Sequence, residues 1–234
     1  MQGGFGMKRK ILIVILIMGL FSTNVSASKF KFIFSPKTAP AFAENNSGIY
    51  CDTAEHWCNY SAERLYNEGI FAGIKIGKKY YFMPDEYITR GEFLLYLNAV
   101  LEIPDNENII LPFEDEKSIP KWQYPTICSM FEKGFIHGNT ENNKTYFNYD
   151  EKISRLECAI ILNNILGLKN TADATEYYDN YIIPKYAVTP IKNVTDYGLM
   201  QGYEDNSFRP YLKINRAMLA NILCMVKDYT KTNK

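Results

Sequence analysis

One short segment occurs three times along this chain. It reads Ile-Thr/Ser/Asn-Arg, and its copies begin at Ile88, Ile153 and Ile214. The arginines of consecutive copies lie 65 and 61 residues apart, and each copy follows a pair of glycines that marks a turn. Self-similarity at a fixed period means that one supersecondary unit is used repeatedly. The repeat therefore constrains fold and function more than any single motif does.

The same order of signals recurs inside each copy. An aromatic residue is followed twelve positions later by a glycine, in the pairs Trp57 and Gly69, Trp122 and Gly134, and Tyr186 and Gly198. The stretch between them has a helical pattern, and the glycine fits the left-handed position that ends a helix. A loop with a short extended piece follows. Each arginine then begins a second helix, with apolar residues three, four, six, seven and ten positions further on.

These signals predict the fold class and the organisation of the chain. We expect a mainly α protein of three tandem helix–loop–helix repeats, with minor β structure in the loops. The expected boundaries are residues 49–103, 104–168 and 169–234.

The first residues have the three parts of a secretory signal peptide. Met7–Lys10 is basic, Ile11–Phe21 is apolar, and Val25–Ala27 is a small-residue cleavage site. The apolar run is about eleven residues, short of the ~20 that span a bilayer. A retained N-terminal anchor is the alternative. We predict a signal peptide at 1–27, a linker at 28–48, and no membrane association after cleavage.

Charge and cysteine content exclude several classes of site. Without residues 1–27 the chain has 23 basic residues against 26 acidic ones, which is no electrostatic footprint for nucleic acid. The five cysteines are an odd number, so they cannot all pair internally. Cys158 and Cys224 lie in apolar helical runs, whereas Cys51 and Cys58 are close enough to pair in an oxidising compartment. With two histidines and no C-x-x-C, the chain has no structural zinc ligand set, and we predict neither a metal nor a cofactor.

The hydroxyl and the glutamate of the repeated segment have a structural explanation. Ser/Thr-x-x-Glu is a capping box, in which the hydroxyl and the glutamate each accept from a free backbone N–H at a helix start. The boxes are Thr89 with Glu92 and Ser154 with Glu157. In the third copy Asn215 can still cap, but Met218 cannot reciprocate.

Capping does not explain the arginines, which are Arg90, Arg155 and Arg216. A positive charge at the first helical position opposes the helix dipole. An anion that rests on the helix N-terminus and is gripped by the guanidinium fork would account for all three. The alternative is an internal salt bridge, for example to Asp52, Asp115 or Asp179 of the same or a neighbouring repeat. The sequence leaves both explanations open.

Trp57 and Trp122 stand where a first helix begins. Core packing is the ordinary role for a tryptophan. A ring at the rim of a groove could instead stack on the C–H face of a sugar.

The combined pattern is that of a known family. It comprises an aromatic-Asp start, the tryptophan, a helix ending in Gly-Ile-x-x-Gly, a Phe-x-Pro loop, and Ile-Thr-Arg-x-Glu at the second helix. This resembles the S-layer homology domain, whose usual complement is three tandem copies, over about residues 49–230. The resemblance implies a pseudo-threefold arrangement with grooves between the repeats. It also implies non-covalent binding of secondary cell-wall polysaccharide, often bearing pyruvate ketals.

On the family pattern Arg90 and Arg155 are the best ligand-binding candidates, and Arg216 is the third. The residues expected beside them are Thr89, Ser154, Trp57 and Trp122. A pyruvyl ketal leaves a free carboxylate on a sugar, which suits an arginine at a helix N-terminus.

The third repeat departs from the family pattern, with Tyr186, Asn215 and Met218 in place of Trp, Thr and Glu. The second repeat has Tyr149 where the first has Pro84. We therefore expect a groove that relies on the third repeat either to bind weakly or to complete the fold only.

The resemblance predicts a secreted, non-enzymatic protein of the cell wall or surface layer. Its expected partner is cell-wall polysaccharide, with other cell-surface proteins as further partners. One alternative is a structural or protein-binding helical repeat without glycan binding. Another is a glycosidase with Glu92 and Glu157 as paired carboxylates, which is disfavoured because capping already explains both glutamates.

Overall fold

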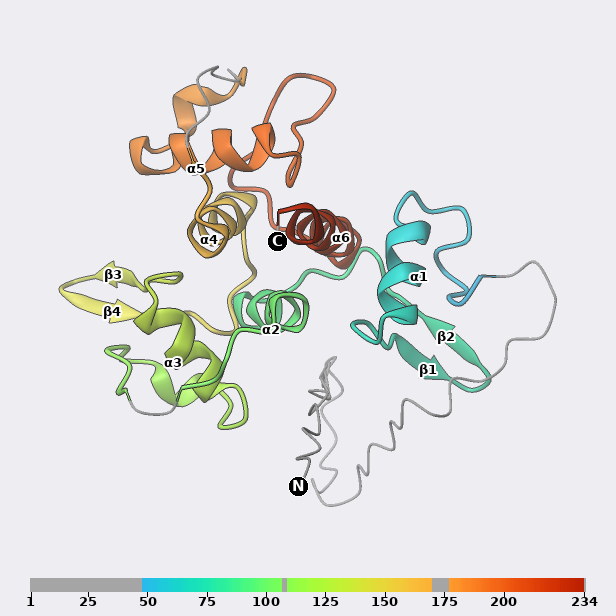
Figure 1. Cartoon of the computed structure of the whole chain (residues 1–234), viewed down its shortest axis with the longest axis horizontal. Helices are drawn as coiled ribbons and strands as arrows, with labels where there is room; N and C mark the ends of the chain where they lie inside the picture. Colours follow the sequence, from blue (N-terminus) through green and yellow to red (C-terminus); the bar gives the residue numbers. More distant parts are fainter. Residues whose placement is uncertain (1–47, 107–108, 170–176, 234) are drawn as a thin grey trace, which may run out of the picture. The chain divides into compact units, whose positions relative to one another are not determined.

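The computed structural model of the chain describes residues 48–106, 109–169 and 177–233. The predicted signal peptide and nearly all of the predicted linker lie outside the described residues. The described ranges contain six α-helices, two small antiparallel hairpins and two short 3-10 turns (Figure 1). In these ranges no helix is long and apolar enough to cross a membrane.

The elements follow the predicted order along the chain. The first repeat has α1 (Asn59–Asn67), β1 (Ile74–Ile76), β2 (Lys79–Tyr81) and α2 (Arg90–Leu101). The second has η1 (Glu116–Ser118), α3 (Tyr124–Glu132), β3 (Asn139–Glu141), β4 (Lys144–Tyr146) and α4 (Arg155–Leu166). The third has η2 (Asn180–Ile182), α5 (Lys185–Asp196) and α6 (Arg216–Thr232). The prediction of a mainly α fold with minor β structure is confirmed.

A buried face on each second helix supplies much of the core. The residues three, four, six and seven positions after each arginine are all buried: Phe93, Leu94, Tyr96 and Leu97 in α2, Cys158, Ala159, Ile161 and Leu162 in α4, and Leu219, Ala220, Ile222 and Leu223 in α6. Cys224 is buried as well, as predicted. Cys51 and Cys58 are free thiols, so the expected pairing between them is wrong.

The aspartates of the repeats hold the loops that precede the second helices. Asp52 accepts hydrogen bonds from the backbone N–H groups of Phe82 and Met83 at 2.8 and 2.7 Å. Asp115 and Asp179 do the same in the second and third repeats. The second residue of each such loop pair has a φ between 56° and 59°, in the left-handed region. The carboxylate therefore stabilises a turn that the backbone alone disfavours.

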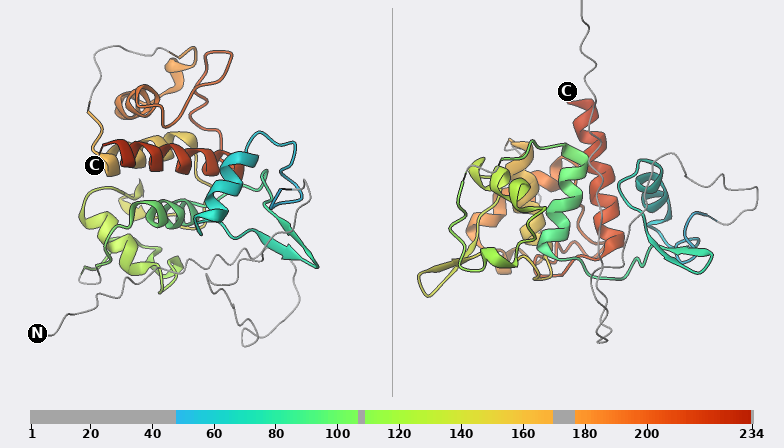
Figure 2. Two further views of the ribbon diagram at one scale, coloured as in Figure 1. Left: turned by 45° about the vertical axis from the view of Figure 1, so that its right-hand side comes forward. Right: turned by 90° about the horizontal axis from the view of Figure 1, so that it is seen from below.

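The three repeats close into a ring of backbone hydrogen bonds. Ile88 N–H donates to Ile214 C=O, Ile214 N–H to Ile153 C=O, and Ile153 N–H to Ile88 C=O, at 3.2, 3.1 and 3.1 Å. α2, α4 and α6 lie side by side at the centre of the three repeats (Figures 1 and 2). The circuit gives the fold its pseudo-threefold arrangement.

Each repeat also contributes to the packing of another. α1 packs against α6, and α5 packs against α4. The first helix of a repeat therefore lies on the second helix of a different repeat, and the sites between helices combine residues from several repeats.

Candidate functional site

The helix starts are built as the repeated segment predicts. Thr89 Oγ1 accepts from Glu92 N–H at 3.2 Å, and Glu92 Oε2 accepts from Thr89 N–H at 2.8 Å. Ser154 and Glu157 form the same pair of bonds at 3.3 and 2.8 Å. In α6 the Asn215 side chain accepts from Met218 N–H at 2.9 Å, and the thioether returns no bond. The third helix start therefore lacks its carboxylate.

The three arginines are buried and reach into a neighbouring repeat. Arg90, Arg155 and Arg216 are 6%, 6% and 3% exposed. Arg90 Nη2 donates to His137 C=O at 2.7 Å, Arg155 Nε to Phe208 C=O at 2.8 Å, and Arg216 Nε to Phe82 C=O at 2.6 Å. Each guanidinium also lies over a buried phenylalanine ring, with its central carbon 4.5–5.3 Å from the centroid. The arginines thus join the repeats.

The alternative of an internal salt bridge is confirmed for Arg90, but the suggested aspartate partners are wrong for all three arginines. Asp52, Asp115 and Asp179 accept backbone N–H groups instead. The carboxylate that meets an arginine comes from a capping box. Glu157 Oε1 lies 3.3 Å from Arg90 Nη1 and forms an ion pair with it.

Arg155 differs from Arg90 in the residue that corresponds to Glu157. The residue of α6 that corresponds to Glu157 of α4 is Met218. Arg155 Nη2 donates to Gln201 C=O at 2.7 Å, and Nη1 has no hydrogen-bond partner among the described residues. Burial lowers the pKa of Arg155 from its ordinary value, as it does for Arg90. Arginine nevertheless stays protonated, so this positive charge has no carboxylate neighbour in the described part of the chain.

A groove of about 440 Å³ opens beside Arg155. Three repeats line it, because Trp57 comes from the turn before α1, Arg155 from the start of α4, and Tyr203 from the loop after α5. Other lining residues are Tyr87, Gln201, Leu212, Asn215, Met218 and Asn221. We call this the Arg155 groove. It combines two cations, Arg155 and Lys213, with side-chain amides and aromatic rings, which can bind an anionic group attached to a polar ring.

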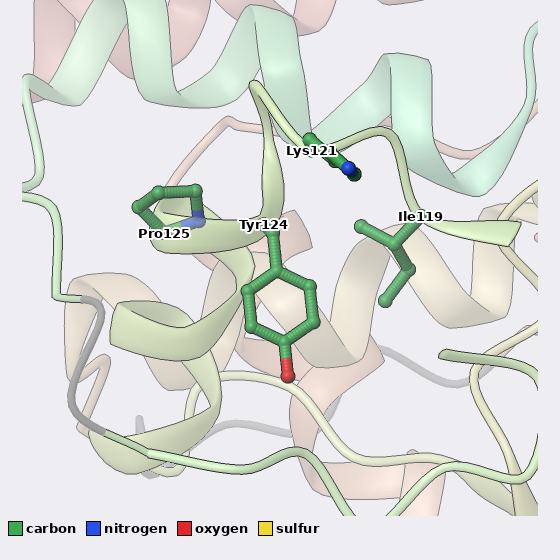
Figure 3. A pocket seen from close by; sticks show the side chains of 4 residues that line it. All are labelled: Ile119, Lys121, Tyr124 and Pro125. Carbon is green, nitrogen blue, oxygen red and sulfur yellow. The ribbon is translucent and has the colours of Figure 1, made fainter. Parts of the chain in front are cut away.

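The tryptophans lie on the surface. Trp57 and Trp122 are 62% and 59% exposed, which excludes a core role, and Tyr186 at the same place in the third repeat is 71% exposed. A smaller hollow of about 290 Å³ lies at the start of α3, beside Trp122 in sequence. Tyr124 stands in it with Ile119, Lys121 and Pro125 around it (Figure 3). This hollow has no arginine in its lining.

Of the predicted binding residues, the structure brings together Trp57 and Arg155. The others do not line either hollow: Arg90, Arg216, Thr89, Ser154 and Trp122. The sequence reasoning missed Gln201, Tyr203 and Met218. The signal for the first two was the loop between Gly198 and Gly202, which follows the first helix of the third repeat.

Comparison with known proteins agrees with this architecture. The sequence model of the S-layer homology domain matches residues 50–94 and 176–218. The chain carries S-layer homology domains. Neither matched segment includes the middle repeat, 104–168. The third repeat is matched despite its departures at Tyr186, Asn215 and Met218. The three repeat boundaries stay a prediction.

Proteins with related sequences include two surface-layer proteins. The chain is 28% identical to an S-layer protein of Bacillus licheniformis, over 52% of this chain and 13% of that protein. It is 24% identical to S-layer protein EA1 of Bacillus anthracis, over 76% of this chain and 20% of that protein. It is 25% identical to an amylopullulanase of Thermoanaerobacterium thermosulfurigenes, over 74% of this chain and 9% of that protein. The aligned part thus spans a fifth or less of the length of each of these relatives.

Proposed function

We propose that this chain is a secreted, non-enzymatic protein of the cell surface that binds cell-wall polysaccharide non-covalently in the Arg155 groove. The supporting observation is a buried guanidinium without a carboxylate neighbour, which lines the same groove as the exposed indole of Trp57. The S-layer homology matches and the surface-layer relatives support attachment at the cell wall. The chain then serves as a wall anchor or as a component of the surface layer.

The ligand chemistry follows from the groove. A pyruvate ketal gives a sugar a free carboxylate, which Arg155 can bind through its Nη1 N–H groups. A hydrogen bond to a charged group contributes about 1.5–3 kcal/mol. The sugar ring adds contacts with Trp57 and with the amide of Gln201 or Asn221. Because the polymer repeats its units, weak binding at one site is strengthened by effective concentration.

The three arginines are unequal in this proposal. The Arg90 guanidinium already forms an ion pair with the Glu157 carboxylate. A ligand carboxylate would have to displace Glu157 and would be repelled by its negative charge. At Arg155 the thioether of Met218 presents no such charge. The departure of the third repeat from the family pattern therefore favours binding.

The glycosidase alternative finds no support in the geometry. Glu92 and Glu157 both accept backbone N–H groups in capping boxes, and Glu157 is further paired with Arg90. Neither is a free carboxyl group beside the Arg155 groove. The amylopullulanase match covers 9% of that enzyme.

A titration of purified cell-wall polysaccharide tests the proposal. Trp57→Ala should weaken binding at least tenfold, and Tyr60→Ala, which removes a ring that is 72% exposed outside the groove lining, should leave it unchanged. Polysaccharide stripped of its pyruvate should bind the native protein as weakly as the variant binds the intact polymer. Equal affinities of native protein and Trp57→Ala would contradict the assignment of this groove.

A further inference from the structure

The third repeat presents a group of exposed aromatic side chains outside the lining of the Arg155 groove. Tyr178 and Tyr181 at η2 are 80% and 83% exposed, and Tyr211 in the loop before α6 is 57% exposed. Ile182 and Leu212 lie beside them in sequence and are 38% and 37% exposed. We call these five residues the tyrosine band. Large apolar and aromatic side chains that are exposed together can mark an interaction site.

Hydrogen bonds hold the two segments of the band together. Tyr211 Oη donates to Ile182 C=O at 3.1 Å, which fixes its ring against η2. Tyr178 N–H donates to Asn206 C=O at 2.8 Å. Between them, Asp179 accepts from Phe208 N–H at 2.8 Å. The band is therefore carried on an ordered scaffold.

The second repeat is charged at the positions of Tyr178, Tyr181, Tyr211 and Leu212, and the first repeat is charged at the last two of these. The correspondence follows from the backbone bonds of the second helices: Arg155 N–H donates to Leu212 C=O as Arg90 N–H donates to Glu151 C=O and Arg216 N–H to Glu86 C=O. Tyr211 and Leu212 thus replace Asp150 and Glu151 of the second repeat and Asp85 and Glu86 of the first. Counted from the loop aspartates, Tyr178 replaces Glu114, and Tyr181 replaces Lys117.

These replacements fit a polymer that carries negative charge. Acidic side chains repel such a polymer. At three of the four positions the third repeat has a neutral side chain where the second has an acid, and at the fourth Tyr181 replaces a lysine. Of the two acids on the loop that contacts Tyr178, Glu204 and Asp205, Asp205 is paired with Arg209 at 2.9 Å. A tyrosine offers a ring face for the C–H groups of a sugar and a hydroxyl for its oxygens.

The band is continuous with the Arg155 groove through one residue. Leu212 belongs to the band and also lines the groove. A chain of sugars that leaves the groove past Leu212 meets Tyr211 and then η2. An interface between two protein copies would not need this continuity.

We propose that the tyrosine band is an accessory binding surface for the same polysaccharide, and that it holds the neutral sugar rings next to the anionic sugar in the Arg155 groove. This inference rests on the proposed function. The groove selects the carboxylate, and the band lengthens the bound stretch of polymer. The third repeat would then contribute both the uncharged Met218 side chain in the Arg155 groove and the tyrosine band beyond the groove.

Calorimetric titration with two ligands separates the band from the groove. The ligands are the long cell-wall polysaccharide and a single pyruvylated sugar. The variant Tyr178→Ala/Tyr181→Ala should bind the polymer roughly tenfold more weakly, the effect of about two lost ring contacts. It should bind the single sugar as the native protein does. Tyr211→Asp, which installs the acid that the first and second repeats have at this position and leaves the groove lining unchanged, should also weaken polymer binding.

Each other result counts against one of the two proposals. Unchanged polymer binding by both variants overturns the band while the groove stands. Equal loss for polymer and single sugar also overturns it, because the band would then act through the groove. Loss of self-association in the variants, measured by analytical ultracentrifugation with polymer binding intact, would reassign the band to contacts between copies. If the native protein binds neither ligand, the proposed function itself fails.

Discussion

A single substitution, Met218→Glu, tests why the Arg155 groove is open. A glutamate there would reach back to Asn215 N–H, as Glu92 and Glu157 reach the capping residues of α2 and α4 at 2.8 Å. Its second oxygen would lie beside Arg155, as Glu157 lies 3.3 Å from Arg90. The variant should therefore be more stable than the native protein and should bind acidic polysaccharide less well.

The two effects have different sizes. Completing the cap and adding a half-exposed ion pair should raise the free energy of unfolding by about 0.5–1 kcal/mol. For a chain of this length that raises Tm by about 1–4 °C. A carboxylate about 4 Å from the ligand carboxylate costs on the order of 4 kcal/mol at an effective dielectric of 20 before screening. Affinity should therefore fall at least tenfold.

Thermal denaturation and polysaccharide titration in one buffer measure both effects. Met218→Gln is the matched control, because an amide can complete the cap without adding a charge, and it should keep most of the native affinity. Glu157→Met is the reciprocal change, which frees Arg90 and should lower Tm. Native affinity in Met218→Glu, together with a raised Tm, would refute the electrostatic reasoning.

Three further predictions concern stability. Gly91→Ala should lower the free energy of unfolding by about 1–3 kcal/mol in urea, because its Cβ would overlap the buried Tyr149 ring. Asp52→Asn should cost about 1–3 kcal/mol in the same assay, because an amide can accept with one oxygen where the carboxylate accepts with two. The hydrogen bond from Arg64 holds the pKa of Asp228 below its usual value. The stability from this pair is complete above the unfolded pKa, near 4, and is lost as the pH falls through the lower folded pKa. Thermal melts from pH 6 to 2 should show this loss in the native protein and less of it in Asp228→Asn.

Each of these three stability predictions has a matched comparison. Adding Tyr149→Ala to Gly91→Ala should recover part of the loss that the overlap causes, and no recovery would contradict that cause. Asp85→Asn removes an exposed carboxylate and should change little. If Asp228→Asn and the native protein lose stability in parallel as the pH falls, the Arg64 pair does not contribute.

Local features of the fold were predictable from the sequence. The capping boxes depend on residues three apart, and the buried faces of the second helices depend on a helical period, so both can be seen within one repeat. The exposure of Trp57 and Trp122 could not be predicted in this way. A tryptophan at a helix start has the same pattern whether it faces the core or a groove rim.

The candidate site was less predictable because its parts come from different repeats. Arg155 meets a loop that follows α5 and the first turn of α6, whereas Trp57 precedes both by more than half of the described chain. The sequence of the third repeat alone predicts weak ligand binding, because this repeat departs most from the family pattern. Only the packing between repeats shows that its Met218 lines the same groove as the arginine of the second.

The closed circuit of Ile88, Ile153 and Ile214 also bears on how the protein folds. Open repeat arrays can fray from one end, because each unit contacts only its neighbours. Here the first repeat joins the last, and Arg216 bonds Phe82 across 134 residues. Loss of any one unit breaks two of the three junctions, so we expect all-or-none unfolding and slow folding from such distant contacts. A repeat that bound nothing would still be retained, since without it the other two could not close.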